Sequence, residues 1–108
     1  MSGFSATARV STAHGSKYLQ QLCKHWQHNL SVEFDAGQGR VVFPRDARGA
    51  DHPGDAVATM TARDDALTLR IDATSAEQLG GLKGVLERHL DRFAFREAPL
   101  SFDWKEPG

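Results

Sequence analysis

The sequence predicts an α+β domain in which two helices pack on one face of an antiparallel β-sheet, a two-layer arrangement. Two stretches carry apolar residues three and four positions apart, as helices do. In the shorter segments between them, apolar and polar residues alternate, and turn residues bound each segment. Hairpins placed between helices favour an antiparallel sheet that is covered on one face. The expected order is β-α-β-β-β-β-α-β, and 108 residues fit a single domain over residues 1–108.

The first half of the chain is expected to form a strand, a helix and a hairpin. Residues 4–10 alternate small and β-branched side chains, which is typical of a strand. The hydroxyls of residues 11–12 can cap the next helix, which we predict over 15–29 from its single apolar stripe. Strands over 31–35 and 40–44 flank a turn with two glycines, as in a hairpin.

A loop and a second hairpin are expected next. Residues 45–55 contain glycine, proline and charged residues without periodicity, which predicts an exposed loop. Segments 56–63 and 67–73 flank an Asp-Asp turn, and alternate leucine and isoleucine side chains of the second segment face the core.

The last elements are a helix and a strand. A capping box from Ser75 to Gln78 starts the helix. The helix contains three glycines, which are costly there and are expected to mark close approach of its backbone to the sheet or to the first helix: Gly80, Gly81 and Gly84. Residues 100–104 alternate as a final strand, and residues 1–3 and 105–108 are expected to be frayed.

The composition excludes several classes of protein. A hydrophobic fraction of 40% and a charged fraction of 25% are ordinary for a globular domain. A net charge of −1 without a basic block argues against binding to nucleic acid. One cysteine, Cys23, excludes an intramolecular disulfide and is expected to be a buried thiol. Because there is neither a signal-like segment nor a long apolar run, we expect a cytoplasmic protein that does not insert into membranes.

Polar residues near the helix ends are the candidates for a ligand site. His89 can converge with His25 of the first helix, or it can be an interfacial histidine. Arg92 and Arg96 can clamp an anion, although the helix dipole alone also favours them at this end. Glu97 completes the group or neutralises one of the arginines.

Two further possibilities involve a tryptophan and a metal. Trp104, on the expected last strand, is the tryptophan more suited to exposure and ligand contact. His25, His28 and His89 are a weak candidate set for a divalent metal, because only His25 and His28 have helical spacing for a shared face.

Two motifs resemble those of a known family. Residues 18–26 read YLQQLCKHW and residues 89–97 read HLDRFAFRE. Together with residues 8–10 and 102–104, they resemble DUF2218, a family of small bacterial proteins of unknown function. Such domains are sometimes fused or neighbour to siderophore-interacting, flavin-dependent ferric reductases. The resemblance implies a role near ferric-siderophore handling and transfers no catalytic residue.

We therefore expect a binding or accessory domain in preference to an enzyme, since no complete catalytic constellation is present; an enzyme of unknown type stays a third hypothesis, which would require a pocket with a strongly perturbed titratable group. Its ligand would be a siderophore-related small molecule. The alternative is a protein-interaction module that docks on a reductase or transporter and has no small-molecule site. The sequence identifies no cofactor.

Overall fold

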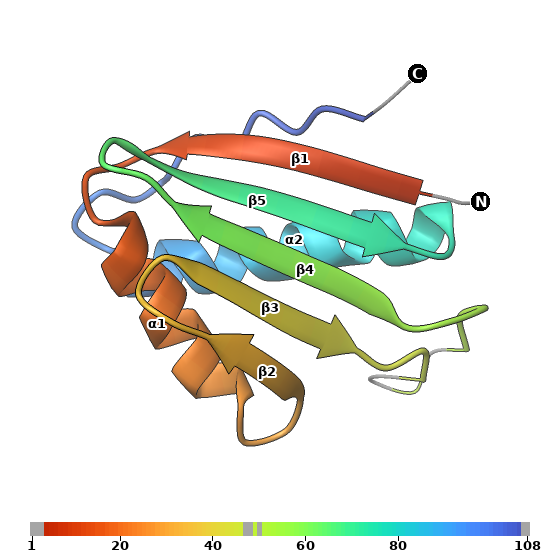
Figure 1. Cartoon of the computed structure of the whole chain (residues 1–108). Helices are drawn as coiled ribbons and strands as arrows, with labels where there is room; N and C mark the ends of the chain where they lie inside the picture. Colours follow the sequence, from red (N-terminus) through yellow and green to blue (C-terminus); the bar gives the residue numbers. More distant parts are fainter. Residues whose placement is uncertain (1–3, 47–48, 50, 107–108) are drawn as a thin grey trace.

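The computed structural model describes residues 4–46, 49 and 51–106. Figure 1 shows an antiparallel sheet with both helices on the same face. The sheet has five strands in the order β1-β5-β4-β3-β2. The elements are β1 (Phe4–Ser11), α1 (Gly15–Trp26), β2 (Ser31–Phe34), β3 (Gln38–Phe43), β4 (Ala56–Ala62), β5 (Ala66–Ala73) and α2 (Ala76–Phe93). The predicted α+β class, with two helices on an antiparallel sheet, is confirmed.

One hydrophobic core lies between the sheet and the helices. Alternate residues of each long strand are buried, as in β5, where Leu67, Leu69 and Ile71 are fully buried and Arg70 and Asp72 are exposed. This alternation is expected for a sheet that faces water on its other side. The helices divide the sheet between them, because α1 contacts β2, β3, β4 and β5 while α2 contacts β5 and β1. In the described part of the chain, neither helix is long and apolar enough to span a membrane.

The cysteine lies in this core, as predicted. Cys23 is fully buried on α1, and burial raises the pKa of its thiol from 9.0 to about 11. Because thiol reagents attack the thiolate, we expect a disulfide reagent to leave Cys23 unlabelled in the native protein at pH 8. Labelling should become rapid in denaturing urea. Fast labelling of the native protein would contradict this burial.

The predicted last strand is wrong. Among the described residues, the C-terminal segment makes one bridge to β1, between Thr7 and Lys105, and otherwise has no strand pairing. Its polar groups instead reach α2, since the Leu100 N–H donates to Asp91 Oδ1 at 2.9 Å and Trp104 Nε1 donates to Glu87 Oε2 at 2.7 Å. Figure 1 shows this segment running beside β1.

The C-terminal end is also more ordered than the predicted frayed tail. The Thr7 and Lys105 backbones exchange hydrogen bonds of 2.9 and 2.8 Å, and Glu106 pairs with Lys83 of α2. The expected fraying of residues 1–3 and 107–108 lies outside the described residues.

The helix ends differ from the predictions in detail. No side chain caps α1; Thr12 Oγ1 accepts the N–H of His14, just before the helix, at 3.1 Å. The helix ends at Trp26, three residues before the predicted end, because the chain turns there: the N–H groups of residues 29–30 both donate to the Trp26 carbonyl.

The predicted cap of α2 is present. Ser75 Oγ accepts the Gln78 N–H at 3.0 Å, and Gln78 Oε1 reaches back to the N–H of Thr74 at 2.7 Å. The helix ends at Phe93, and residues 94–97 form a turn. Arg96 and Glu97 therefore lie beyond the helix, so Arg92 and Arg96 do not share a helical face.

Candidate functional site

A groove of about 840 Å³ lies between the helices near the end of β3. The last turn of α1 contributes His25 and Trp26, the end of β3 contributes Phe43, and α2 contributes one long side from Glu77 to His89. His52, from the loop between β3 and β4, adds a further wall. The groove thus joins three separate parts of the sequence: the end of α1, the end of β3 with the loop after it, and α2.

Aromatic rings form the apolar part of the groove. The Trp26 ring, of a residue only 7% exposed, packs edge-to-face against Phe43, with ring centroids 5.1 Å apart. The ring of His89, on α2, also lies near Trp26, with the two ring centroids 5.1 Å apart. Such rigid, mostly buried rings provide a surface on which a flat ligand group can pack.

Two predicted site residues come together in the groove. The imidazoles of His25 and His89, from different helices, have centroids 5.5 Å apart. The carbonyl of Val85 can only accept a hydrogen bond, so His89 Nδ1, at 2.8 Å, carries the proton and donates it there. This bond fixes the orientation of the His89 ring beside His25.

The predicted metal set does not assemble. Among the residues that the structure describes, no three His, Cys, Asp or Glu side chains are grouped as metal ligands would be. His28 lies past the end of α1 and does not line the groove, unlike His25 and His89. The three histidines therefore do not form one site.

The other four predicted residues lie outside the groove: Arg92, Arg96, Glu97 and Trp104. Trp104 is half-buried, bonds to Glu87 and stacks on Phe102 with centroids 6.4 Å apart. The Arg96 guanidinium lies 5.6 Å from the ring centroid of Phe95, its neighbour in sequence. The structure thus assigns Trp104 and Arg96 to other contacts.

Glu97 lies at the opposite end of α1 from His25. It accepts hydrogen bonds from the Tyr18 hydroxyl and from Thr12 Oγ1, which is 3.0 Å from both carboxylate oxygens. The hydrogen bond from Tyr18 lowers the pKa of Glu97, with smaller contributions in the same direction from Thr12 and from the charge of His14. Glu97 therefore fastens the turn after α2 to the start of α1.

This contact predicts a specific loss of stability in acid. The folded pKa of Glu97 is below the ordinary value of 4.5, so its contribution is present above pH 4.5 and is lost as the pH falls through the folded pKa. We expect Glu97→Gln to lower the free energy of unfolding by about 1 kcal/mol at pH 7, and by less at pH 3. Urea unfolding at both pH values measures this difference.

The exposed Glu33 of β2 provides a matched control, since no hydrogen bond of its side chain is found within the described residues. Glu33→Gln should change stability little at either pH. An equal effect of Glu97→Gln at pH 7 and pH 3 would contradict the role of the Glu97 carboxylate.

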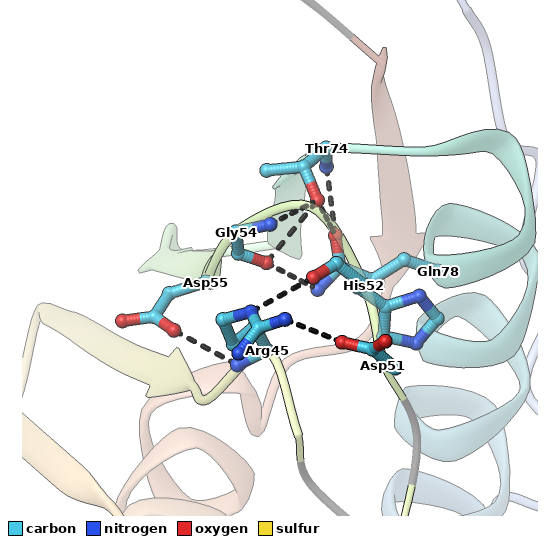
Figure 2. Close-up of polar contacts among 7 residues, drawn as sticks. All are labelled: Arg45, Asp51, His52, Gly54, Asp55, Thr74 and Gln78. Atoms are coloured by element: carbon cyan, nitrogen blue, oxygen red, sulfur yellow. Dashed lines mark hydrogen bonds and ion pairs between the residues drawn. The ribbon is translucent and has the colours of Figure 1, made fainter.

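The loop over residues 45–55 is exposed for the most part, as predicted, and its described residues are also well anchored. The Arg45 N–H donates to Asp55 Oδ1 at 2.8 Å, Arg45 Nε donates to the His52 carbonyl at 3.0 Å, and Arg45 pairs with Asp51 (Figure 2). In addition, the backbone carbonyl of Arg45 accepts a hydrogen bond from the His52 N–H at 3.0 Å. Residues 47, 48 and 50 lie outside the described part of this loop.

The same loop is fastened to the start of α2. Gly54 donates its N–H to Thr74 Oγ1 at 3.1 Å, and its carbonyl accepts Gln78 Nε2 at 3.0 Å, as Figure 2 shows. Gln78 is only 4% exposed, so these bonds belong to the buried framework of the fold. Together with Arg45, they hold His52 at the edge of the groove.

The glycines of α2 have a different role from the predicted one. A Cβ added at Gly80 or Gly81 would meet nothing within 4 Å, so no close approach of the sheet or of α1 requires them. Both line the groove, as does Gly84. Glycine inside a helix costs about 1 kcal/mol relative to alanine. The three glycines thus leave this side of the groove with little side-chain cover, and the helix is less stable for it.

The sequence prediction also missed Arg88. This residue lines the groove, whereas Arg92, one turn later, does not. A Cβ at Gly84 would lie 3.0 Å from Arg88 Nη1, which shows that the guanidinium folds back over Gly84. The Gly84–Arg88 spacing of four residues was the available signal, because helical side chains point back toward the preceding turn.

Comparison with known proteins places the chain in a family. The model of the uncharacterized protein family conserved in bacteria, DUF2218, matches residues 7–105. The chain belongs to this family. An NMR structure of PA4090 from Pseudomonas aeruginosa is 25% identical to this DUF2218 chain, with a TM-score of 0.72 over 94% of this chain and 95% of that one. No curated protein shows significant similarity to the chain.

Proposed function

We propose that this DUF2218 chain is a non-catalytic bacterial binding domain whose groove takes a small ligand, in an accessory role in iron–siderophore handling. The observation that carries the proposal is the groove itself. Its volume of about 840 Å³ falls in the range of about 300–1,000 Å³ that is usual for small-molecule sites. It also combines aromatic rings with a few polar groups, which is the usual composition of such sites.

The lining of the groove suits binding better than covalent catalysis. Among its described lining residues there is no serine, threonine, cysteine or lysine to act as a nucleophile, and Glu77 is the one carboxylate. His89 Nδ1 is committed to the Val85 carbonyl, which orients the ring. These features favour recognition by fixed rings and charges.

A ferric siderophore is a ligand of suitable chemistry. Siderophore ligand groups are oxygen anions, often on aromatic rings, and the groove offers both ring surfaces and cationic groups. Trp26 and Phe43 provide the first, and Arg88 provides the second, while the imidazoles of His25 and His89 add hydrogen-bonding groups. The family that matches the chain is uncharacterized, so the accessory role near ferric reductases is proposed only from what the resemblance implies.

Amide-correlation NMR of the untagged protein tests the proposal. We would titrate gallium complexes of catecholate, hydroxamate and carboxylate siderophores, since Ga³⁺ replaces Fe³⁺ without paramagnetic broadening. We expect saturable shifts at the Trp26 indole N–H and at the amides of Gly80 and Gly81. The ferric complex of the best ligand should broaden the same signals.

Two histidine variants provide a matched comparison. His25→Asn removes a ring that lines the groove, whereas His28→Asn changes an exposed residue outside it. We expect only His25→Asn to weaken binding. If no signal moves with any complex, the small-ligand function is wrong, and docking on a reductase or transporter becomes the leading alternative.

A further inference from the structure

Arg88 places a positive charge at the groove that no described residue pairs with. Three other arginines pair with a carboxylate: Arg9 with Asp65, Arg45 with Asp51 and Arg70 with Asp72. No ion pair or hydrogen bond joins the Arg88 guanidinium to another residue that the structure describes, which is also true of Arg40, Arg63, Arg92 and Arg96, but of these five only Arg88 lines the groove. A guanidinium fork matches a carboxylate with two parallel hydrogen bonds.

The guanidinium of Arg88 lies over a glycine. If residue 84 carried a Cβ, that atom would lie 3.0 Å from Arg88 Nη1. The Arg88 side chain therefore lies flat along α2, with its charge against the helix backbone and within the groove. The absence of a side chain at Gly84 leaves room for this charge, which suggests a positioning role that a variant can test.

The two ends of the groove differ in charge. Arg88 lies next to His89, which adjoins His25, whereas Glu77 lies eleven positions earlier, about 16 Å along the helix axis. Between them, Gly80 and Gly81 leave the helix backbone open, and α1 contributes the Trp26 ring. The groove thus has a cationic end, a flat middle and an anionic end.

From this arrangement we infer that the groove selects a flat aromatic ligand with a carboxylate, which Arg88 binds while the aromatic body packs against Trp26 and the glycine stretch. The inference rests on the proposed function of the groove as a ligand site and adds the class and the orientation of the ligand. It also replaces Arg92 and Arg96 with Arg88 as the anion-binding residue.

The test compares two probes of one shape on three proteins. We would titrate 2-naphthoate and its neutral amide, 2-naphthamide, into the full chain and follow the Trp26 indole N–H. Arg88→Met removes the charge in the groove, and Arg92→Met makes the same change one turn away, outside it. We expect Arg88→Met to weaken naphthoate binding about tenfold, because a charge-assisted bidentate contact is lost. Naphthamide binding should be equal in all three proteins.

Gly84→Ala tests the positioning role. The added Cβ should displace the guanidinium, so naphthoate binding should weaken while naphthamide binding stays the same. Thermal unfolding should show that this variant is at least as stable as the wild type, because alanine is the better helix former.

Equal naphthoate binding by the wild type and Arg88→Met, or equal losses in Arg88→Met and Arg92→Met, would overturn the inference. So would a failure of naphthoate to bind the wild type. The gallium-siderophore titration is independent of these outcomes: shifts in the groove there would leave the proposed function standing, and their absence would overturn it as well.

Discussion

Replacing Trp26 with alanine is expected to lower the free energy of unfolding by about 3–5 kcal/mol. Trp26 is 7% exposed, belongs to the hydrophobic core and contacts the rings of Phe43 and His89. The substitution leaves a cavity where α1 meets the end of β3, and it also removes the aromatic surface of the groove. Urea unfolding followed by circular dichroism measures the loss.

Trp104→Ala is the matched control for this prediction. Trp104 is only half-buried, and its loss removes one hydrogen bond to Glu87 and one ring contact with Phe102. We expect a smaller loss, about 1–2 kcal/mol, and unchanged ligand binding in the groove. Similar losses for the two tryptophans would contradict the central position of Trp26.

A methyl group at Gly39 is expected to cost about 1–3 kcal/mol, and most of that cost should depend on Cys23. Gly39 is buried on β3, and an added Cβ would lie 2.7 Å from Cys23 Sγ and 3.4 Å from Leu19 Cδ2. The sulfur belongs to a short, fully buried side chain on α1, so it has little room to move. Overpacking of this kind forces the helix and the strand apart.

A double-mutant cycle separates the two partners. Cys23→Ala removes the sulfur, so Gly39→Ala should cost less in that background by about 1 kcal/mol. Gly37→Ala serves as the control, because its Cβ would meet only Asp35 Oδ1 at 3.7 Å, an ordinary contact distance. Additive effects of Gly39→Ala and Cys23→Ala would contradict the predicted clash.

Much of the fold follows from local patterns in the sequence. The apolar stripe of α1 and the alternation in β5 identify a helix and a strand because each element buries one face. The alternation of Leu100, Phe102 and Trp104 also reports burial correctly, since all three pack on the core. The alternation does not predict which backbone the segment pairs with. The Leu100 N–H and the Trp104 indole N–H instead donate to side chains of α2.

The candidate site was less predictable, because it depends on how distant segments meet. His25 and His89 could be proposed together from residue type alone, and the crossing of the two helices places their rings in contact. His52 lines the groove only because the loop that carries it is anchored to α2. The end of α2 at Phe93 turns Glu97 toward Tyr18, which the sequence pattern did not indicate.

Arg88 and Arg92 illustrate the same limit. They are four residues apart on one helix, and the sequence separates them only by the glycine that precedes Arg88 by four positions. Only the extent of the groove distinguishes them, together with the space that Gly84 leaves for the Arg88 side chain.

The strand order has a consequence for the time that the chain needs to fold. Strands β2 to β5 follow one another in both sequence and space, so their pairing closes only short loops. β1 pairs only with β5 in the sheet, and Ser11 must find Ala66 across one helix and three strands. Closing such long loops slows folding, and during synthesis β1 has to wait until β5 has emerged. Until then the apolar side chains of β1 stay exposed, which makes this first strand the segment most dependent on chaperones or on rapid completion of the chain.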